Sequence, residues 1–212
     1  CDNVGHRSAH MPWHAGPSLL EALESAETVV AAATNFRMPV QWVNRPDQSF
    51  RGYAGTICGG RVSAGDEIVV QPGGQRARIE RIVTADGDLP EAGHGQAVTL
   101  TLDRELDASR GDVIADAAHP APQSDQFAAH VLWMGDEALL PNRSYWLKIG
   151  TRTVNARVTA IKQKVDVNTP AQLAAHRLEL NEVGYCNIDL DHDVAFEAYV
   201  DDPALGGFIL VD

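Results

Sequence analysis

The feature that most limits the fold of this chain is a two-residue alternation of apolar and polar side chains in short segments. It is clearest in residues 96–102, QAVTLTL, where Val98, Leu100 and Leu102 fall on one face of an extended strand and the threonines between them on the other. The same kind of segment occurs in RMPVQWV, RGYAGTI, DEIVVQ, ARIERIV and SRGDVI, each bounded by Gly, Pro, Asp or Asn. No crossover helix separates them, so we expect residues 36–118 to form a closed or nearly closed small β-barrel.

A second group of extended segments follows the small, Pro-rich residues 115–124, where we place a domain boundary. Its predicted strands are QFAAHVLWM, SYWLKIG, TVNARVTAIKQKV, HRLELN, GYCNIDL, VAFEAYV and GGFILVD. In HRLELN, Leu178 and Leu180 alternate with charged residues, which predicts one wet face. Residues 169–176 are expected to form a single helical turn. We therefore expect residues 119–212 to form a second consecutive β-barrel, which makes the chain all-β.

Residues 1–35 have a different character. The first sixteen are polar and lack periodicity, whereas Ser18 and Glu21 have the spacing of a capping box and precede the leucines of LLEALES. This pattern predicts a short helix with one apolar stripe. The small and polar residues between that helix and Phe36 are expected to be a linker.

Charge and cysteine content exclude several classes of protein. Seventeen basic and twenty-nine acidic residues give a net charge of −12, which argues against binding to nucleic-acid phosphates. The sequence contains no apolar run long enough for a membrane-spanning helix and no signal peptide, so we expect a soluble, cytoplasmic protein without membrane contact. The cysteines Cys1, Cys58 and Cys186 are too widely spaced to suggest disulfides or a metal site, and we expect the last two to be small buried residues in strands.

Two motifs could suggest a metal ion. His6, His10 and His14 would align on a helix, but Pro12 would interrupt it, and an irregular exposed segment is the better interpretation.

The second motif is D-x-D-x-D at residues 189–193, which resembles the start of a calcium loop. Val194 and Val200 stand where such a loop needs Gly and Glu. We expect acidic residues on the wet side of a strand end instead. The sequence also lacks a P-loop and a G-x-S-x-G motif, so we predict no catalytic, cofactor-binding or metal-binding residue in this chain.

Glycines divide the segment RGYAGTICGGRVSAGDEIVVQPGG in a way that permits tight bends and close backbone approach. Together with GQAVTLTL and SRGDVI, this segment resembles the second domain of translation-type GTPases. The motifs FRMPVQWVNRP, KIGTRTV and LELNEVG, in that order, narrow the resemblance to the GTPase subunit of bacterial ATP sulfurylase, the large subunit of sulfate adenylyltransferase.

This resemblance implies two barrels like domains 2 and 3 of elongation factors. It also implies that GTP and Mg²⁺ bind in a separate N-terminal domain carrying P-loop, D-x-x-G and N-K-x-D motifs, of which residues 1–35 would hold only the tail, the short helix and the linker. In that family the GTPase subunit pairs with a catalytic small subunit and can be fused to an adenylylsulfate kinase. GTP hydrolysis drives the formation of adenosine 5′-phosphosulfate and pyrophosphate from ATP and sulfate. The family further implies a closing strand of the second barrel after Asp212.

For the subunit interface we predict Arg37, Gln41, Asn44 and Arg45, which group polar side chains around Trp42 beside a predicted strand. The alternative is that the two arginines are solvated and Trp42 fills the barrel core, and for Trp42 we favour the core. The alternative function is a free-standing double-barrel module that binds RNA or protein.

Overall fold

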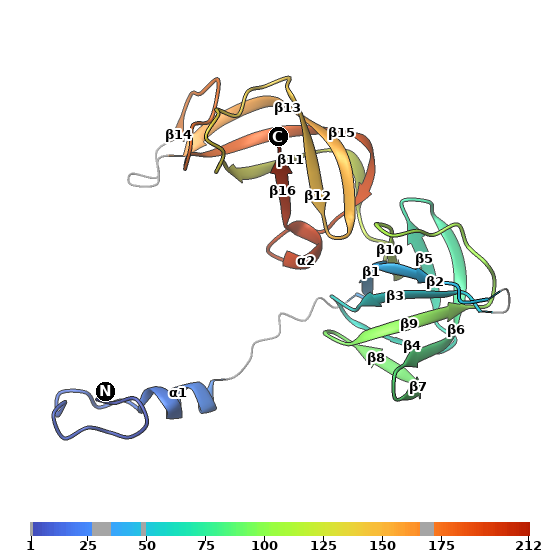
Figure 1. Ribbon diagram of the computed structural model, residues 1–212, viewed down its shortest axis with the longest axis horizontal. Coiled ribbons are helices and arrows are strands. Elements are labelled where there is room, and N and C mark those ends of the chain that lie inside the picture. Colours follow the sequence, from blue (N-terminus) through green and yellow to red (C-terminus); the bar gives the residue numbers. More distant parts are fainter. Residues whose placement is uncertain (1, 27–34, 48–49, 166–171) are drawn as a thin grey trace. The chain divides into compact units, whose positions relative to one another are not determined.

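The computed structural model describes residues 2–26, 35–47, 50–165 and 172–212 (Figure 1). The chain divides into two compact units, Cys1–Ala31 and Ala32–Asp212. The predicted linker before Phe36 lies almost wholly outside the described residues.

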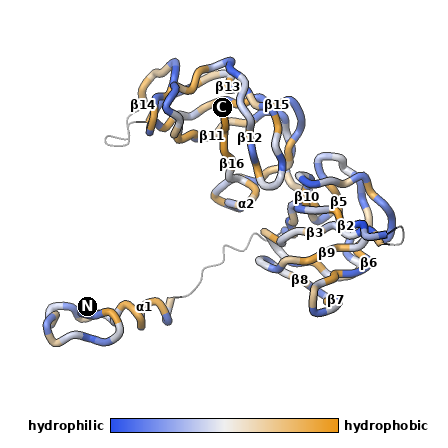
Figure 2. The backbone as a smooth tube through the Cα atoms, in the orientation of Figure 1, coloured by the Kyte–Doolittle hydropathy of each residue, from blue (hydrophilic) through white to orange (hydrophobic). Residues whose placement is uncertain are grey.

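The first unit contains the predicted helix, α1 (Leu19–Ser25). Its capping box is confirmed, because the Glu21 amide donates to Ser18 Oγ at 3.3 Å and the Ser18 amide donates to Glu21 Oε2 at 2.8 Å. The apolar stripe of α1, coloured as hydrophobic in Figure 2, is exposed: Leu19, Leu20 and Leu23 are each about half or more accessible within this unit.

The first barrel of the second unit consists of an antiparallel sheet and a separate two-stranded sheet. Its strands are β1 (Arg37–Pro39), β2 (Trp42–Asn44), β3 (Gly52–Thr56), β5 (Glu67–Gln71), β6 (Gln75–Thr84), β7 (Gly87–Leu89), β9 (Ala97–Leu102) and β10 (Val113–Asp116), and β4 (Arg61–Ser63) pairs with β8 (Glu91–Gly93). The order is β1-β10-β5-β6-β9-β3-β2, with β7 on β6. The alternation in β9 is confirmed, since Val98, Leu100 and Leu102 are all buried in the core.

A close approach of backbones explains one glycine of this barrel. A Cβ atom on Gly55 would lie 2.4 Å from Pro39 O, so β3 can pass the end of β1 only without a side chain there. This agrees with the prediction that strand glycines permit tight approach.

The second barrel is built on another antiparallel sheet. Its elements are β11 (Gln123–Leu132), β12 (Ser144–Ile149), β13 (Arg152–Val165), β14 (Gln172–Leu173), β15 (Val183–Ala195), α2 (Pro203–Gly206) and β16 (Phe208–Val211). The order is β11-β15-β13-β12-β16, with β14 on β13, so β11 and β16 are its edges. Leu139, Leu147, Val158, Leu178 and Ile188 are fully buried in its core. The strand-rich architecture of both sheets confirms the all-β prediction. We keep the domain boundary between residues 118 and 119 as a proposal.

Several predicted elements of the second barrel are wrong in detail. HRLELN is no strand: Leu178 makes one isolated bridge to Leu139, and Leu180 is exposed because the chain turns at Asn181, which has a φ of 65°. GYCNIDL and the first residues of VAFEAYV belong to the single strand β15. Residues 169–171 of the predicted helical turn lie outside the described residues, and the next two form β14.

Candidate interface residues

Arg37, predicted for the subunit interface, does not lie on an open surface, and the alternative that its side chain is solvated is wrong. Its side chain is only 4% exposed, and its Nε donates to Glu197 Oε1 of the second barrel at 2.7 Å. The guanidinium also donates from NH1 to Phe36 O at 2.9 Å and to His119 O at 2.8 Å. A buried guanidinium needs such neutralisation and hydrogen bonding, so this contact joins the barrels.

A second polar contact lies elsewhere between the barrels. Arg152 NH1 donates to Asp112 Oδ1 at 2.9 Å, and both side chains are less than a quarter exposed. Thr151 Oγ1 donates to Val40 O at 2.8 Å beside it. These contacts fix the β12–β13 turn of the second barrel to the first.

Small apolar residues fill the space between the polar contacts. We call this cluster the seam; it comprises Val69, Val113 and Ala115 of the first barrel and Ala121, Ala195 and Leu205 of the second. All six are buried, and Gln71 Nε2 of the first barrel donates to Ala121 O at 2.7 Å. An interface with a dry centre and hydrogen-bonded ion pairs is expected to hold two domains in one orientation.

The other predicted interface residues are separate from Arg37. Gln41 and Arg45 are exposed, and Arg45 NH2 lies 3.5 Å from Glu105 Oε1, whereas Asn44 is half-buried in β2. Trp42 is 64% exposed, so the prediction that it fills the core is wrong: at this end of β2 its side chain points outward. Gln41, Trp42 and Arg45 form what we call the edge patch.

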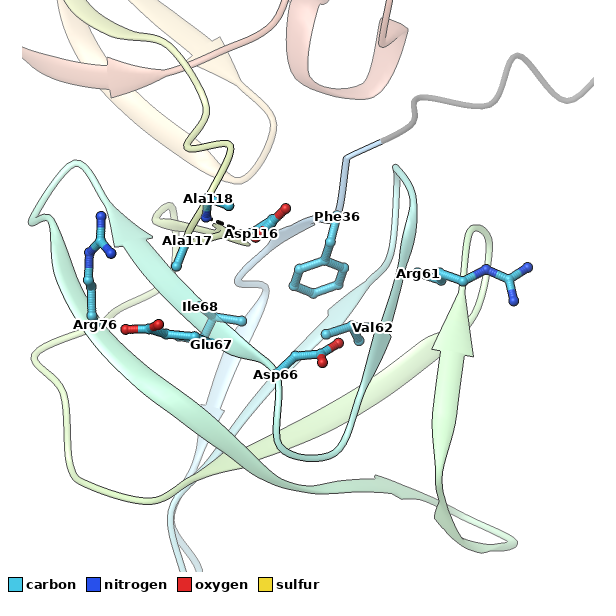
Figure 3. A pocket seen from close by; sticks show the side chains of 10 residues that line it. All are labelled: Phe36, Arg61, Val62, Asp66, Glu67, Ile68, Arg76, Asp116, Ala117 and Ala118. Atoms are coloured by element: carbon cyan, nitrogen blue, oxygen red, sulfur yellow. Dashed lines mark hydrogen bonds between the residues drawn. The ribbon is translucent and has the colours of Figure 1, made fainter.

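A mixed-charge pocket of about 440 Å³ lies on the first barrel (Figure 3). Phe36 points into it, while Arg61 extends away from its centre. Three of its charged groups have partners within the protein: Arg61 pairs with Glu91, Asp66 Oδ2 accepts from the Ser63 amide at 2.8 Å, and Asp116 accepts from the Ala118 amide at 2.9 Å and pairs with His119. This pattern gives no arrangement for catalysis.

A larger apolar groove of about 1410 Å³ lies on the second barrel between its edge strands. Exposed Leu132, Met134, Tyr199 and Ile209 line it. Within the described residues neither β11 nor β16 pairs with a further strand on its outer side, so the groove offers two free strand edges.

The structure brings neither the N-terminal histidines nor the D-x-D-x-D motif at residues 189–193 together as a set of metal ligands among the described residues. His10 Nδ1 lies 3.7 Å from Asp2 Oδ1 and His14 Nε2 lies 3.1 Å from Pro17 O, in a segment of turns and bends without a helix, as predicted. The described residues contain no group of three or more His, Cys, Asp or Glu side chains placed to hold a metal ion. Asp191 and Asp193 are exposed on β15, as predicted for a wet strand end.

In the described parts of the chain, no helix has the length and apolar character needed to span a membrane.

The sequence of this chain is similar to parts of longer proteins of known name. Over all 212 residues it is 54% identical to the bifunctional enzyme CysN/CysC of Xylella fastidiosa, of which it spans 34%. It is 44% identical over 213 aligned residues to sulfate adenylyltransferase subunit 1 of Laribacter hongkongensis, of which it spans 44%. Along its whole length, the chain is similar to part of sulfate adenylyltransferase subunit 1. It spans between a third and a half of these curated relatives.

Family and structural comparisons agree with the fold. Residues 126–212 match the family described as GTP-eEF1A C-terminal domain-like. Sup35 complexed with GMPPNP is 21% identical, with a TM-score of 0.79 over the whole chain and 53% of that protein. Elongation factor SelB from Methanococcus maripaludis in its apo form is 22% identical, with a TM-score of 0.65 over 84% of this chain and 40% of that protein. The predicted translation-factor type of the two barrels is thus confirmed.

The residues that join the barrels were largely missed from the sequence. Glu197 lies in a predicted strand, Asp112 in SRGDVI, and Thr151 and Arg152 in KIGTRTV, but none of these segments predicts a contact between the barrels. Only the position of Arg37 in a polar motif indicated an interface, and in the structure that residue contacts the second barrel.

Proposed function

We propose that this chain is the twin-barrel segment of the GTPase subunit of a sulfate adenylyltransferase. In that enzyme GTP hydrolysis is coupled to the formation of adenosine 5′-phosphosulfate and pyrophosphate from ATP and sulfate. The observation that carries the proposal is the similarity to subunit 1 and CysN/CysC proteins along the entire chain. This segment contributes regulation and interaction, while guanine nucleotide and Mg²⁺ bind in a separate GTPase domain.

The two barrels act in this proposal as one rigid body. The Arg37–Glu197 and Asp112–Arg152 pairs support it, because two separate charged contacts flanking an apolar seam resist both sliding and rotation. A rigid body can transmit a nucleotide-dependent change from the GTPase domain to a distant partner, which a flexible pair of domains cannot.

The proposed partners are the GTPase domain of the same protein and the catalytic small subunit, in the cytoplasm. The name CysN/CysC supports a parent protein that also carries an adenylylsulfate kinase. For contact with the small subunit we propose the edge patch, because exposed Trp and Arg side chains are enriched at interface hot spots.

The test uses the parent protein co-expressed with its small subunit. Wild type should co-purify with the small subunit and form adenosine 5′-phosphosulfate faster with GTP than with GDP. Trp42→Ala should weaken the complex by about tenfold or more, as expected for a hot spot. Trp146→Ala is the matched control, since Trp146 is also half exposed but lies on the second barrel.

Each outcome bears on a different part of the proposal. A parent protein whose sulfate activation ignores GTP would refute the function. Unchanged binding by the Trp42 variant would refute the edge patch alone. Salt-sensitive retention of RNA by the chain on a filter would instead favour the RNA-binding alternative.

A further inference from the structure

Cys58 lies at the seam rather than inside a strand as predicted. It follows β3, and its half-buried side chain packs against the seam cluster. Its backbone amide donates to Arg37 O at 2.9 Å, and its Sγ lies 3.4 Å from the same oxygen. The thiol is therefore adjacent to the residue that carries the main ion pair between the barrels.

Asp202 of the second barrel lies near the thiol, because it directly precedes α2, whose Leu205 belongs to the same seam cluster as Cys58. Asp202 is 3% exposed and caps α2, with Oδ1 accepting from the amides of Ala204 at 2.9 Å and Leu205 at 3.3 Å. Its Oδ2 is buried and has no hydrogen-bond partner among the described residues. Burial, and then the Asp202 carboxylate, raise the pKa of the Cys58 thiol well above its ordinary value.

These observations define two states of the thiol. While the barrels are docked, the protonated thiol lies beside Asp202 and is a poor nucleophile, because the thiolate is the reactive form. If the seam opens, both burial and the Asp202 charge are withdrawn, and the thiol regains ordinary reactivity. Docking leaves little room for an added group, since Leu205 and Ala195 are also buried there.

We propose that Cys58 is a redox-sensitive latch of the seam: docking protects its thiol, and a mixed disulfide on it keeps the barrels apart. The co-reactant is a low-molecular-weight disulfide such as oxidised glutathione. The Cys58 thiolate of an opened molecule attacks one sulfur, the disulfide bond breaks, and the other half leaves as a thiolate. Reduction by an added thiol reverses the step and restores docking.

This inference deepens the proposed rigid-body role but does not depend on sulfate chemistry. Its tests use the 212-residue chain without ATP, sulfate, GTP or partner. If sulfate activation failed and the latch tests succeeded, only the proposed enzyme would be refuted; the opposite result would refute only the latch.

The first test measures protection with iodoacetamide, followed site by site by peptide mass spectrometry. Cys58 in the folded chain should react about tenfold or more slowly than in the urea-unfolded chain. Glu197→Gln should speed its reaction severalfold, because the variant removes the charge that neutralises Arg37. Cys186, fully buried in the second barrel, should stay protected and so exclude global unfolding as the cause.

Glu137→Gln is the matched control, since that exposed carboxylate pairs with Arg143 away from the seam. Its Cys58 labelling rate should equal that of wild type. Labelling of Cys58 in folded wild type at the unfolded rate would overturn the proposal. So would an equal rise at Cys58 and Cys186 in Glu197→Gln, which would mean that the whole chain had unfolded.

The second test follows the position of the barrels by small-angle X-ray scattering after treatment with oxidised glutathione. Wild type should show a larger radius of gyration once Cys58 is modified and recover on reduction. Cys58→Ala should keep its untreated scattering profile in the same reagent. An unchanged radius of gyration in protein fully modified at Cys58 would overturn the latch.

Discussion

Arg152 of the second barrel donates from NH1 to Asp112 Oδ1 of the first barrel at 2.9 Å. The same Asp112 side chain accepts the Ser109 amide through Oδ2 at 2.8 Å, so one carboxylate both closes a turn and joins the barrels. A residue with two such roles couples the local conformation of the 109–112 turn to the docking of the second barrel.

Arg152→Met should therefore lower the free energy of unfolding by about 1–2 kcal/mol, because it leaves a mostly buried carboxylate with fewer donors. Urea denaturation of the chain measures this. Arg81→Met, which breaks the exposed Arg81–Asp88 pair, should cost less than about 1 kcal/mol. If both variants lost the same free energy of unfolding, the proposed role of the Asp112–Arg152 pair in joining the barrels would be contradicted.

Gly55→Ala should destabilise the first barrel by about 3 kcal/mol. The new methyl group would lie 2.4 Å from Pro39 O, a backbone atom that can move away only if β1 shifts. Gly73→Ala is the control, since its nearest atom would be 4.0 Å away and the change should stay within about 0.5 kcal/mol. Thermal unfolding compares the stability of the two variants. If Gly55→Ala were as stable as wild type, β1 and β3 would not be held in close contact.

Tyr53→Phe tests a buried hydrogen bond of the first barrel. The Tyr53 hydroxyl donates to Leu106 O at 2.9 Å and accepts from the Leu106 amide at 3.3 Å. Losing both should cost about 1–2 kcal/mol and speed amide exchange at Leu106. Tyr199→Phe, at an exposed ring, should leave stability unchanged. Unaltered exchange at Leu106 would show that the hydroxyl does not hold that loop.

Strands β3, β5, β6 and β9 of the first barrel could be predicted because their signals are local, whereas RMPVQWV forms two strands, β1 and β2, and the short strands β4, β7 and β8 were missed. The alternation within QAVTLTL alone predicts that Leu100 lies in the core. The capping box of α1 is local as well, since Ser18 and Glu21 are three residues apart. Both features depend on residues that are close together in the sequence, so their spacing can be recognised from the sequence alone.

The interface residues could not be predicted because their partners are distant in the sequence. Arg37 and Glu197 are 160 residues apart, and no periodicity connects them. Trp42 was misassigned for a related reason: its apolar character suggests a core, but its exposure depends on which face of β2 the barrel covers. Leu180 fails similarly, because a turn at Asn181 ends the alternation that would have buried it.

Asp116 provides a pH-dependent prediction. The hydrogen bond from His119, and then the one from the Ala118 amide, lower the pKa of the Asp116 carboxyl below its usual value. A carboxyl whose folded pKa is depressed adds stability above its unfolded pKa of about 4, and this contribution disappears as the pH falls through the lower, folded value. Asp116→Asn should consequently be less stable than wild type near pH 6, with a difference that shrinks steadily as the solution is acidified below about pH 4.

Urea denaturation at several pH values measures that difference directly. His119→Ala should reproduce part of the change, because it removes the largest cause of the lowered pKa while the Ala118 amide still donates to Oδ1. A stability difference between wild type and Asp116→Asn that stays constant across the acid range would contradict the prediction. It would mean that the carboxyl has the same affinity for protons in the folded and unfolded chain, and that the contact with His119 does not persist in solution.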